Sequence, residues 1–147
     1  METIDIIETN IDDMNPEIYP HVIDRLMESG ALDAYITNII MKKGRPAIKL
    51  SVLASQKDTE KLSNIIFDET TSIGVRVFSA KRKVLDREVK EVKTKYGKIR
   101  VKISKSGGEI KNIMPEFEDC RKAAGKFKVP LKRVYEEIKN HAPLEGL

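Results

Sequence analysis

Residues 35–53 of this 147-residue chain read YITNIIMKKGRPAIKLSVL, and this stretch decides the fold. Two apolar runs of strand length, both rich in β-branched residues, flank the basic segment 41–46. That pattern predicts a β-hairpin with the basic segment as its loop. Gly44 tolerates a positive φ, and Pro46 suits the start of a strand, where no ladder donor is required. Three cations at a hairpin tip indicate either an anion-binding loop or a solvated basic turn.

The segments on either side of the hairpin complete a regular order of elements. Residues 3–11 predict a strand, and Asn15 followed by Pro16 predicts the start of a helix that ends at Gly30. After the hairpin, residues 58–70 have helical spacing and residues 75–80 alternate as a strand. The order β-α-β-β-α-β is that of a ferredoxin-like split unit. We therefore expect an α+β fold with a ferredoxin-like core in residues 1–80.

The second half of the chain has a different pattern. Residues 81–95 and 98–105 alternate charged and apolar side chains on either side of a turn at Tyr96-Gly97, which predicts an extended, charged β-hairpin. A short strand over residues 109–114, a helix opening at Pro115 and a helix after Pro130 follow. We expect residues 81–147 to be an appended hairpin and helical segment that forms one structural unit with the core. It could be an added layer or could reach a neighbouring subunit.

The overall composition limits the class of protein. The net charge of +4 is a mild excess that permits an anionic ligand without indicating a nucleic-acid-binding protein. Cys120 is the single cysteine; it excludes an intramolecular disulfide, and its place on an apolar helix face predicts a buried core thiol. No apolar run is long enough to span a membrane, and the first residues are acidic rather than typical of a signal peptide. We expect a cytoplasmic protein without a membrane partner.

The split β-α-β topology predicts where the polar loops lie. Right-handed crossovers give the strand order 4-1-3-2, in which the first and second strands run in the same direction. Residues 12–13, the hairpin loop 42–46 and residues 70–74 then lie at the same end of the sheet. Three polar loops are therefore predicted to share one rim.

The residues of this rim suggest a ligand. Asp12 and Asp13 offer the hard oxygen ligands that Mg²⁺ and Mn²⁺ prefer, and the cations of the hairpin loop can contact phosphate oxygens. A nucleoside triphosphate with its divalent cation would satisfy both groups. The alternative is structural: adjacent aspartates before a helix often cap it, and these two could form salt bridges to the lysines.

Several longer motifs resemble a known family. The segments ETNIDDMNPE (8–17), GALDA (30–34), MKKGRP (41–46), ETTSIGVR (69–76) and PEFEDC (115–120) are similar to the C-terminal domain of the LarC family. LarC proteins are nickel-insertion proteins that complete the nickel-pincer nucleotide cofactor of lactate racemase. The resemblance covers nearly the whole chain.

The resemblance implies a function and a set of site residues. It implies a CTP-dependent nickel chelatase, a lyase that binds CTP with Mn²⁺ or Mg²⁺ and inserts its substrate Ni²⁺ into pyridinium bisthiocarboxylic acid mononucleotide. The family's C-terminal domain is ferredoxin-like, holds the CTP and assembles as a hexamer. Carried over by motif position, Asp12 and Asp13 would bind the metal, and no catalytic residue is indicated. The positions expected to bind the nucleotide are Lys42, Lys43, Gly44, Arg45, Ser72 and Arg76.

Full family members carry an additional N-terminal domain, whereas this chain begins close to the ETNIDD motif. We therefore expect an excised domain or a separately encoded half, which has that N-terminal domain as a partner and does not insert nickel alone. Two other classes of function stay open. One is a non-catalytic ferredoxin-like module for ligand binding or oligomerisation. The other, ranked last, is an RNA-binding module that would use Lys93, Lys95 and Lys98 of the charged hairpin.

Overall fold

The computed structural model describes residues 1–141, and the chain divides into two compact units. The first unit is Met1–Lys83 and the second begins at Val84. Sequence patterns placed this boundary after residue 80 and treated the second segment as one structural unit with the first. In the structure each unit has a hydrophobic core of its own, so each is described separately.

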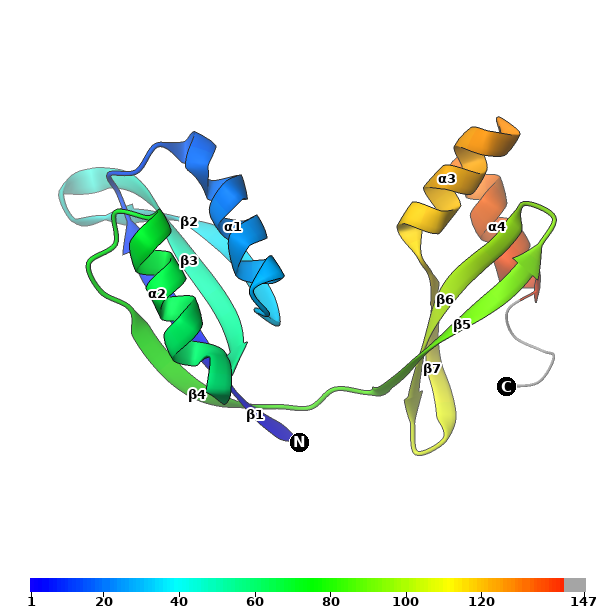
Figure 1. The fold of residues 1–147 in the computed structure, drawn as a ribbon, viewed down its shortest axis with the longest axis horizontal. Coiled ribbons are helices and arrows are strands. Elements are labelled where there is room, and N and C mark those ends of the chain that lie inside the picture. Colours follow the sequence, from blue (N-terminus) through cyan, green and yellow to red (C-terminus); the bar gives the residue numbers. More distant parts are fainter. Residues whose placement is uncertain (142–147) are drawn as a thin grey trace. The chain divides into compact units, whose positions relative to one another are not determined.

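The first unit is a four-stranded antiparallel sheet with two helices (Figure 1). The sheet order is β2-β3-β1-β4, which is the predicted order 4-1-3-2. The expectation of a ferredoxin-like α+β core is confirmed. The elements are β1 (Glu2–Ile11), η1 (Pro16–Ile18), α1 (Tyr19–Glu28), β2 (Asp33–Met41), η2 (Lys42–Gly44), β3 (Arg45–Ser55), η3 (Gln56–Asp58), α2 (Thr59–Glu69) and β4 (Arg76–Arg82).

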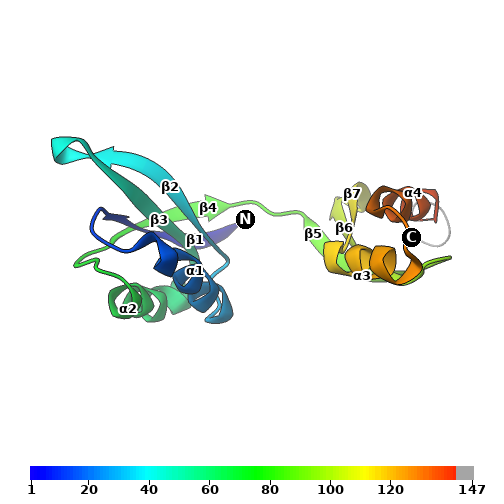
Figure 2. The ribbon, with the colours of Figure 1, turned by 90° about the horizontal axis from the view of Figure 1, so that it is seen from above.

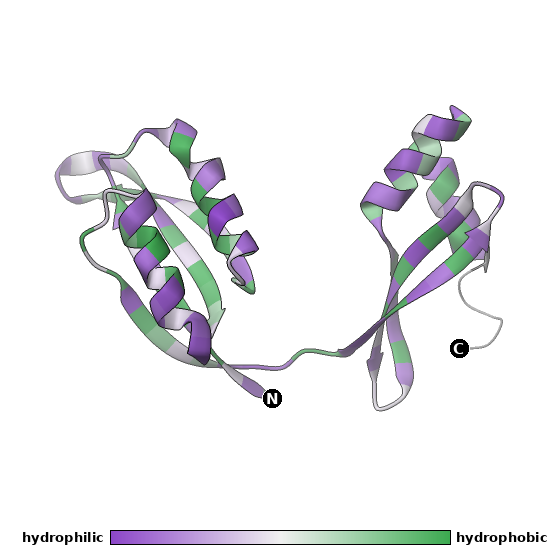
Figure 3. Cartoon of the chain, in the orientation of Figure 1, coloured by the Kyte–Doolittle hydropathy of each residue, from purple (hydrophilic) through white to green (hydrophobic). Residues whose placement is uncertain are grey.

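Both helices of this unit cover the same face of the sheet (Figure 2). Alternate residues of the strands point toward the helices, and the buried ones are mostly apolar. Figure 3 shows hydrophobic residues in green along the strands and in both helices of this unit. Burial of these side chains drives the packing of helices onto sheet. The buried cluster consists of Ile7, Ile11, Met14, Val22, Leu26, Ala31, Ile48, Leu50, Val52, Ala54, Leu62 and Ile66.

The predicted helix signals around the first helix are confirmed. The Asn15 side chain accepts a hydrogen bond from the backbone N–H of Glu17, 3.1 Å away, and so caps η1, which leads into α1. Gly30 follows the helix with φ 100°, and the N–H of Ala31 donates to the carbonyl of Leu26 at 3.0 Å. This is the Schellman arrangement in which glycine is favoured because its left-handed backbone carries no steric cost.

The second unit consists of a three-stranded antiparallel sheet in the order β5-β6-β7 and two helices. The elements are β5 (Asp86–Thr94), β6 (Gly97–Ser106), β7 (Glu109–Pro115), α3 (Phe117–Phe127) and α4 (Leu131–His141). Cys120 is fully buried, as predicted. The core cluster is Ile99, Val101, Ile103, Cys120, Ala123, Val134 and Ile138.

The charged hairpin and the short strand predicted over residues 109–114 are confirmed, and Ile103 of β6 pairs with Ile113 of β7, so that all three strands form one sheet. Two other sequence predictions for the second unit need correction. Pro115 does not open a helix; it is the last residue of β7, opposite Val101, and α3 begins at Phe117. The turn between β5 and β6 was predicted at Tyr96-Gly97. In the structure it lies one residue earlier, at residues 95–96, because Gly97 already belongs to β6 and pairs with Thr94. Within residues 1–141 no helix is long and apolar enough to cross a membrane.

Candidate functional site

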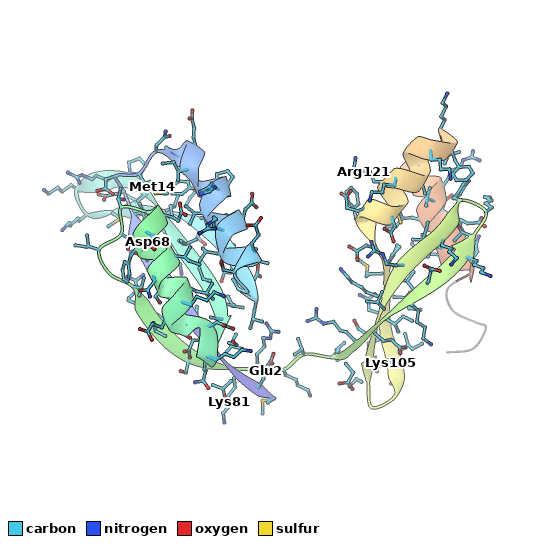
Figure 4. The ribbon with its side chains drawn as sticks, in the orientation of Figure 1. Glu2, Met14, Asp68, Lys81, Lys105 and Arg121 are labelled. Atoms are coloured by element: carbon cyan, nitrogen blue, oxygen red, sulfur yellow. The ribbon has the colours of Figure 1, made fainter. Side chains whose placement is uncertain are left out.

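Three loops of the first unit meet at one end of its sheet, as predicted. Nη1 of Arg45 donates to Oδ2 of Asp12 at 3.0 Å, which joins the hairpin loop to the end of β1. The Thr71 hydroxyl donates to Oδ1 of Asp13 at 2.5 Å, which joins the loop after α2 to the same turn. Figure 4 shows Met14, the next residue in this turn, at the opposite end of the unit from Glu2 and Lys81. We call this end of the first unit the rim.

The hairpin loop has an unusual backbone. Lys43 has φ 64° and ψ 18°, and Gly44 has φ 69°, so two successive residues adopt the left-handed conformation. For a lysine this conformation is strained, and such strain concentrates at binding sites. Lys42 and Lys43 are exposed, and within residues 1–141 neither side chain forms a hydrogen bond or an ion pair. The loop therefore presents, at a strained tip, two lysine side chains that have no partner among the described residues.

The loop after α2 is anchored by a buried threonine that sequence reasoning missed. Thr9 is 3% exposed, and its hydroxyl donates to the carbonyl of Gly74 at 2.9 Å. The Ser72 hydroxyl lies 2.5 Å from Oγ1 of Thr9 and 2.9 Å from the same carbonyl. Ser72 was predicted to bind a nucleotide; the structure shows its hydroxyl holding the loop. The sequence does contain a signal for this role of Thr9. In the strand it lies midway between Ile7 and Ile11, on the face that points into the core, where a polar side chain needs a hydrogen-bond partner.

Arg76 is, with Ser72, one of the two predicted nucleotide-binding residues outside the hairpin loop. It lies on the sheet face opposite the helices. Its Nη2 donates to Oδ1 of Asn10 at 3.0 Å and lies 3.7 Å from Oε2 of Glu8. Glu8 also accepts a hydrogen bond from Lys49 at 2.8 Å, and this bond is the main cause of the lowered pKa of Glu8. In the structure Arg76 belongs to this network and does not contact the hairpin loop.

A pocket of about 840 Å³ adjoins the rim between α1, β2 and β3. Its polar lining residues include Asp12, Asp24 and Asn38. Burial, and next the negative charge of Asp13, raise the pKa of the lining residue Tyr19. An apolar pocket with a few convergent polar groups is the usual form of a small-molecule site. The apolar part of the wall is formed by Ile11, Met14, Pro16, Pro20, Ile23, Ile36, Pro46, Ala47 and Ile48.

The oxygen donors of the rim fit one kind of cation. Among the side chains that the structure describes, in residues 1–140, no three His, Cys, Asp or Glu lie together as a metal-binding group. Asp12 and Asp13 supply two carboxylates, each held by a neighbour. Mg²⁺ is typically bound by one or two carboxylates, with substrate phosphates and waters completing its shell. The pair therefore fits a hard divalent cation that arrives with a polyphosphate.

The basic side chains of β6 in the second unit are mostly neutralised. Lys98 pairs with Glu91 at 2.7 Å and Lys102 with Glu116 at 2.8 Å. Arg100 makes a two-pronged contact with Asp119, at 2.8 Å from Nε and 2.7 Å from Nη2, which lowers the pKa of that carboxyl. These ion pairs favour a solvated surface over an RNA-binding one, because RNA phosphates attract unpaired cations.

Comparisons with known proteins agree with the observed fold and identify the family of the chain. A family model described as "Nickel insertion protein" matches residues 1–135. The pyridinium-3,5-bisthiocarboxylic acid mononucleotide nickel insertion protein of Acetivibrio thermocellus is 52% identical over 137 residues, which are 93% of this chain and 33% of that protein. The protein of the same name from Thermotoga sp. (strain RQ2) is 47% identical over 133 residues, 90% of this chain and 33% of that protein. The chain thus spans about a third of the length of these curated relatives.

Two solved structures are similar over most of the chain. One is described as LarC2, the C-terminal domain of a cyclometallase involved in the synthesis of the NPN cofactor of lactate racemase, in its apo form. It matches with a TM-score of 0.89 and 36% identity, covering 95% of this chain and 96% of that one. A protein of Methanopyrus kandleri matches with a TM-score of 0.69 and 25% identity, covering 90% of this chain and 84% of that one.

Proposed function

Because this chain belongs to the nickel insertion protein family, we propose that it is the CTP- and divalent-cation-binding part of a nickel insertase. The whole enzyme is a CTP-dependent chelatase of the lyase class that places its substrate Ni²⁺ into the pincer nucleotide cofactor of lactate racemase. The nucleotide binds at the rim together with Mn²⁺ or Mg²⁺. The pincer-nucleotide precursor and the remaining part of such a protein, including its N-terminal domain, are the partners.

The observation that carries this proposal is the convergence of opposite charges at the rim. Two hydrogen bonds, Arg45 to Asp12 and Thr71 to Asp13, bring three loops together. Lys42 and Lys43 remain unpaired there within the described residues. A triphosphate with its cation is complementary to this arrangement, because its phosphate oxygens need cations while its metal needs carboxylates.

Each residue of the rim has a distinct task in this proposal. Lys42 and Lys43 contact phosphate oxygens as point charges, and Arg45 offers a planar fork. The backbone N–H groups of the tip add donors, as successive amides in a turn conformation form anion-binding nests. Asp12 and Asp13 hold the cation, which neutralises phosphate charge when bound. The adjoining pocket takes the nucleoside, since it is apolar and opens beside Asp12.

Calorimetry tests the proposal directly. CTP is titrated into the chain with and without Mn²⁺, alongside ATP, GTP and UTP. We expect binding of CTP in preference to the other three nucleotides, and only with the divalent cation. Lys42→Ala should weaken it, whereas Lys132→Ala, a matched loss of an exposed lysine in the second unit, should not. Equal affinity for all four nucleotides would contradict the preference for CTP, and an unchanged CTP affinity in Lys42→Ala would show that the rim is not the site.

One observation favours a second candidate, a non-catalytic ligand-binding or oligomerisation module. Asp12 and Asp13 already have partners in Arg45 and Thr71, so both carboxylates have structural roles without any cation. Thermal unfolding separates the two functions, because a ligand of the native state raises the midpoint. If neither CTP nor another nucleotide raises it in the presence of Mn²⁺, the module without nucleotide binding is favoured.

A further inference from the structure

Each aspartate of the rim is held through one of its two carboxylate oxygens. Arg45 donates to Oδ2 of Asp12, and the Thr71 hydroxyl donates to Oδ1 of Asp13. In the part of the chain that the structure describes, Oδ1 of Asp12 and Oδ2 of Asp13 form no hydrogen bond or ion pair. Supporting contacts of this kind orient the carboxylates that bind a metal. Thr71 is itself exposed, so its position needs a support of its own.

The loop that carries Thr71 is held on both sides of this residue. On one side, the Thr70 hydroxyl donates to the carbonyl of Ile66 at 2.6 Å, which ties the loop to the last turn of α2. On the other side, the hydroxyl of Ser72 lies 2.5 Å from Oγ1 of Thr9. The N–H of Ser72 also donates to Oγ1 of Thr70 at 3.1 Å. Thr71 is therefore the middle residue of a turn whose two ends are bonded to α2 and β1.

Thr9 is the point at which this loop joins the sheet. The ladder between β1 and β4 ends at the pair of Glu8 and Arg76, and beyond it the Thr9 hydroxyl donates to the carbonyl of Gly74 at 2.9 Å. The Thr9 side chain is 3% exposed on the core face of β1. Valine would fill the same space without a polar group that needs a partner. The hydroxyl therefore has a specific use at this position, which is to hold the loop.

We propose that Thr9 is a positioning residue for the divalent cation of the rim and acts through Thr71 and Asp13. Thr9 joins the end of β1 to the loop inside the core, by its contact with Gly74. Thr71 joins the same two segments at the surface, by its contact with Asp13. The inner contact keeps the loop where the outer contact can form, and the outer contact leaves Oδ2 of Asp13 for the cation. This inference rests on the proposed function, because the cation is the one that binds there with CTP.

Calorimetric titration of CTP in the presence of Mn²⁺ tests this series of contacts. Thr9→Val keeps the shape of the side chain and removes the hydroxyl, and it should weaken binding about tenfold, as the loss of a contact that supports a metal ligand does. Thr71→Val, at an exposed position, should weaken it equally. Thr9→Ser keeps the hydroxyl and should bind like the wild type. The matched control is Thr59→Val, which removes a hydroxyl that donates to Asp5 at 2.8 Å and should leave binding unchanged.

The Asp13→Asn variant separates positioning from a general loss of structure. If Thr9 acts through Asp13, adding Thr9→Val to this variant should weaken binding no further, because residues that act as one coupled unit are not additive. A tenfold loss in the wild-type background that is repeated in the Asp13→Asn background would show that Thr9 acts on the fold as a whole. That result would overturn the proposal.

Hydrogen exchange gives a measurement that needs no ligand. The Ser72 amide is bonded within the turn, so it should exchange faster in Thr9→Val than in the wild type or in Thr9→Ser. The positioning role is overturned if Thr9→Val is folded by circular dichroism and either keeps the wild-type affinity for CTP with Mn²⁺ or leaves the exchange of Ser72 unchanged. A wild-type protein that binds no CTP would instead overturn the proposed function, and with it the cation that Thr9 is inferred to serve.

Discussion

Replacing Lys43 by glycine separates the backbone strain of the hairpin loop from its charge. Lys43 is in the left-handed conformation, with φ 64° and ψ 18°. That conformation costs a non-glycine residue about 1–2 kcal/mol, and glycine loses about 0.5–1 kcal/mol more than other residues in backbone entropy on folding. Because Lys43 has no side-chain partner within residues 1–141, little else is lost. The net gain in the free energy of unfolding is about 0–1.5 kcal/mol, with a central value of about 0.75 kcal/mol.

In the Lys43→Gly variant the unfolding midpoint measured by calorimetry should therefore rise, while the affinity for CTP should fall. The central value of this gain corresponds to a rise in the unfolding midpoint of the first unit of about 3–6 °C for a domain of this size. A charge-assisted hydrogen bond to phosphate contributes about 1.5–3 kcal/mol, and the exposure of the loop favours the lower end. Loss of the cation should then weaken CTP binding by about tenfold.

Lys128 supplies the matched control, because it is the other non-glycine residue with positive φ in the described chain. It has φ 51° and ψ 44° at the end of α3, where the N–H of Val129 donates to the carbonyl of Ala124. Lys128→Gly should stabilise the second unit by a similar amount and leave CTP affinity unchanged. The reasoning is refuted if Lys43→Gly lowers the unfolding midpoint, if it binds CTP as tightly as wild type, or if Lys128→Gly weakens binding equally.

Three further outcomes are expected. Asp12→Asn should reduce the dependence of CTP binding on Mn²⁺ in calorimetry while changing stability by no more than about 1 kcal/mol, because its ion pair with Arg45 is exposed. Leu62→Ala should destabilise the first unit by about 2–5 kcal/mol and leave amide protection in the second unit unchanged in hydrogen exchange, since the two cores are separate. The stability of the second unit should fall as the pH drops below the ordinary Asp119 pKa of 3.8, because Arg100 lowers that pKa in the folded state and protonation ends the interaction. Asp119→Asn should make midpoints measured by circular dichroism less dependent on pH in this range, and an unchanged acid dependence would contradict the assignment.

Sequence patterns predicted the first unit closely because its signals are local and agree with one another. Asn15 caps a helix start, Gly30 adopts the left-handed conformation after α1, and alternating apolar residues define the strands. The handedness of split β-α-β crossovers then determines which loops meet. That rule, and no single motif, predicted that residues 12–13, the hairpin loop and residues 70–74 share one end of the sheet.

The finer features of the site depend on side-chain directions that no local pattern determines. The bond from Thr71 to Asp13 spans two loops far apart in the chain, and either residue alone is an ordinary turn residue. The pocket depends on how α1 packs over β2, where Ile36 and Asn38 look like members of an alternating strand. Pro115 was misread for a similar reason: proline suits the start of a helix and the end of an outer strand equally well.

The central position of β1 has a consequence for how the first unit forms. This strand is made first, yet it lies between β3 and β4 and needs both to complete its ladders. Glu2 pairs with Arg82, so the sheet cannot close until synthesis reaches the last residues of the unit. Such long sequence separations slow folding, because loop-closure entropy must be overcome before the contacts form. During synthesis the nascent chain therefore carries an apolar strand without neighbours, and the β2–β3 hairpin, whose contacts are local, is the part able to form early.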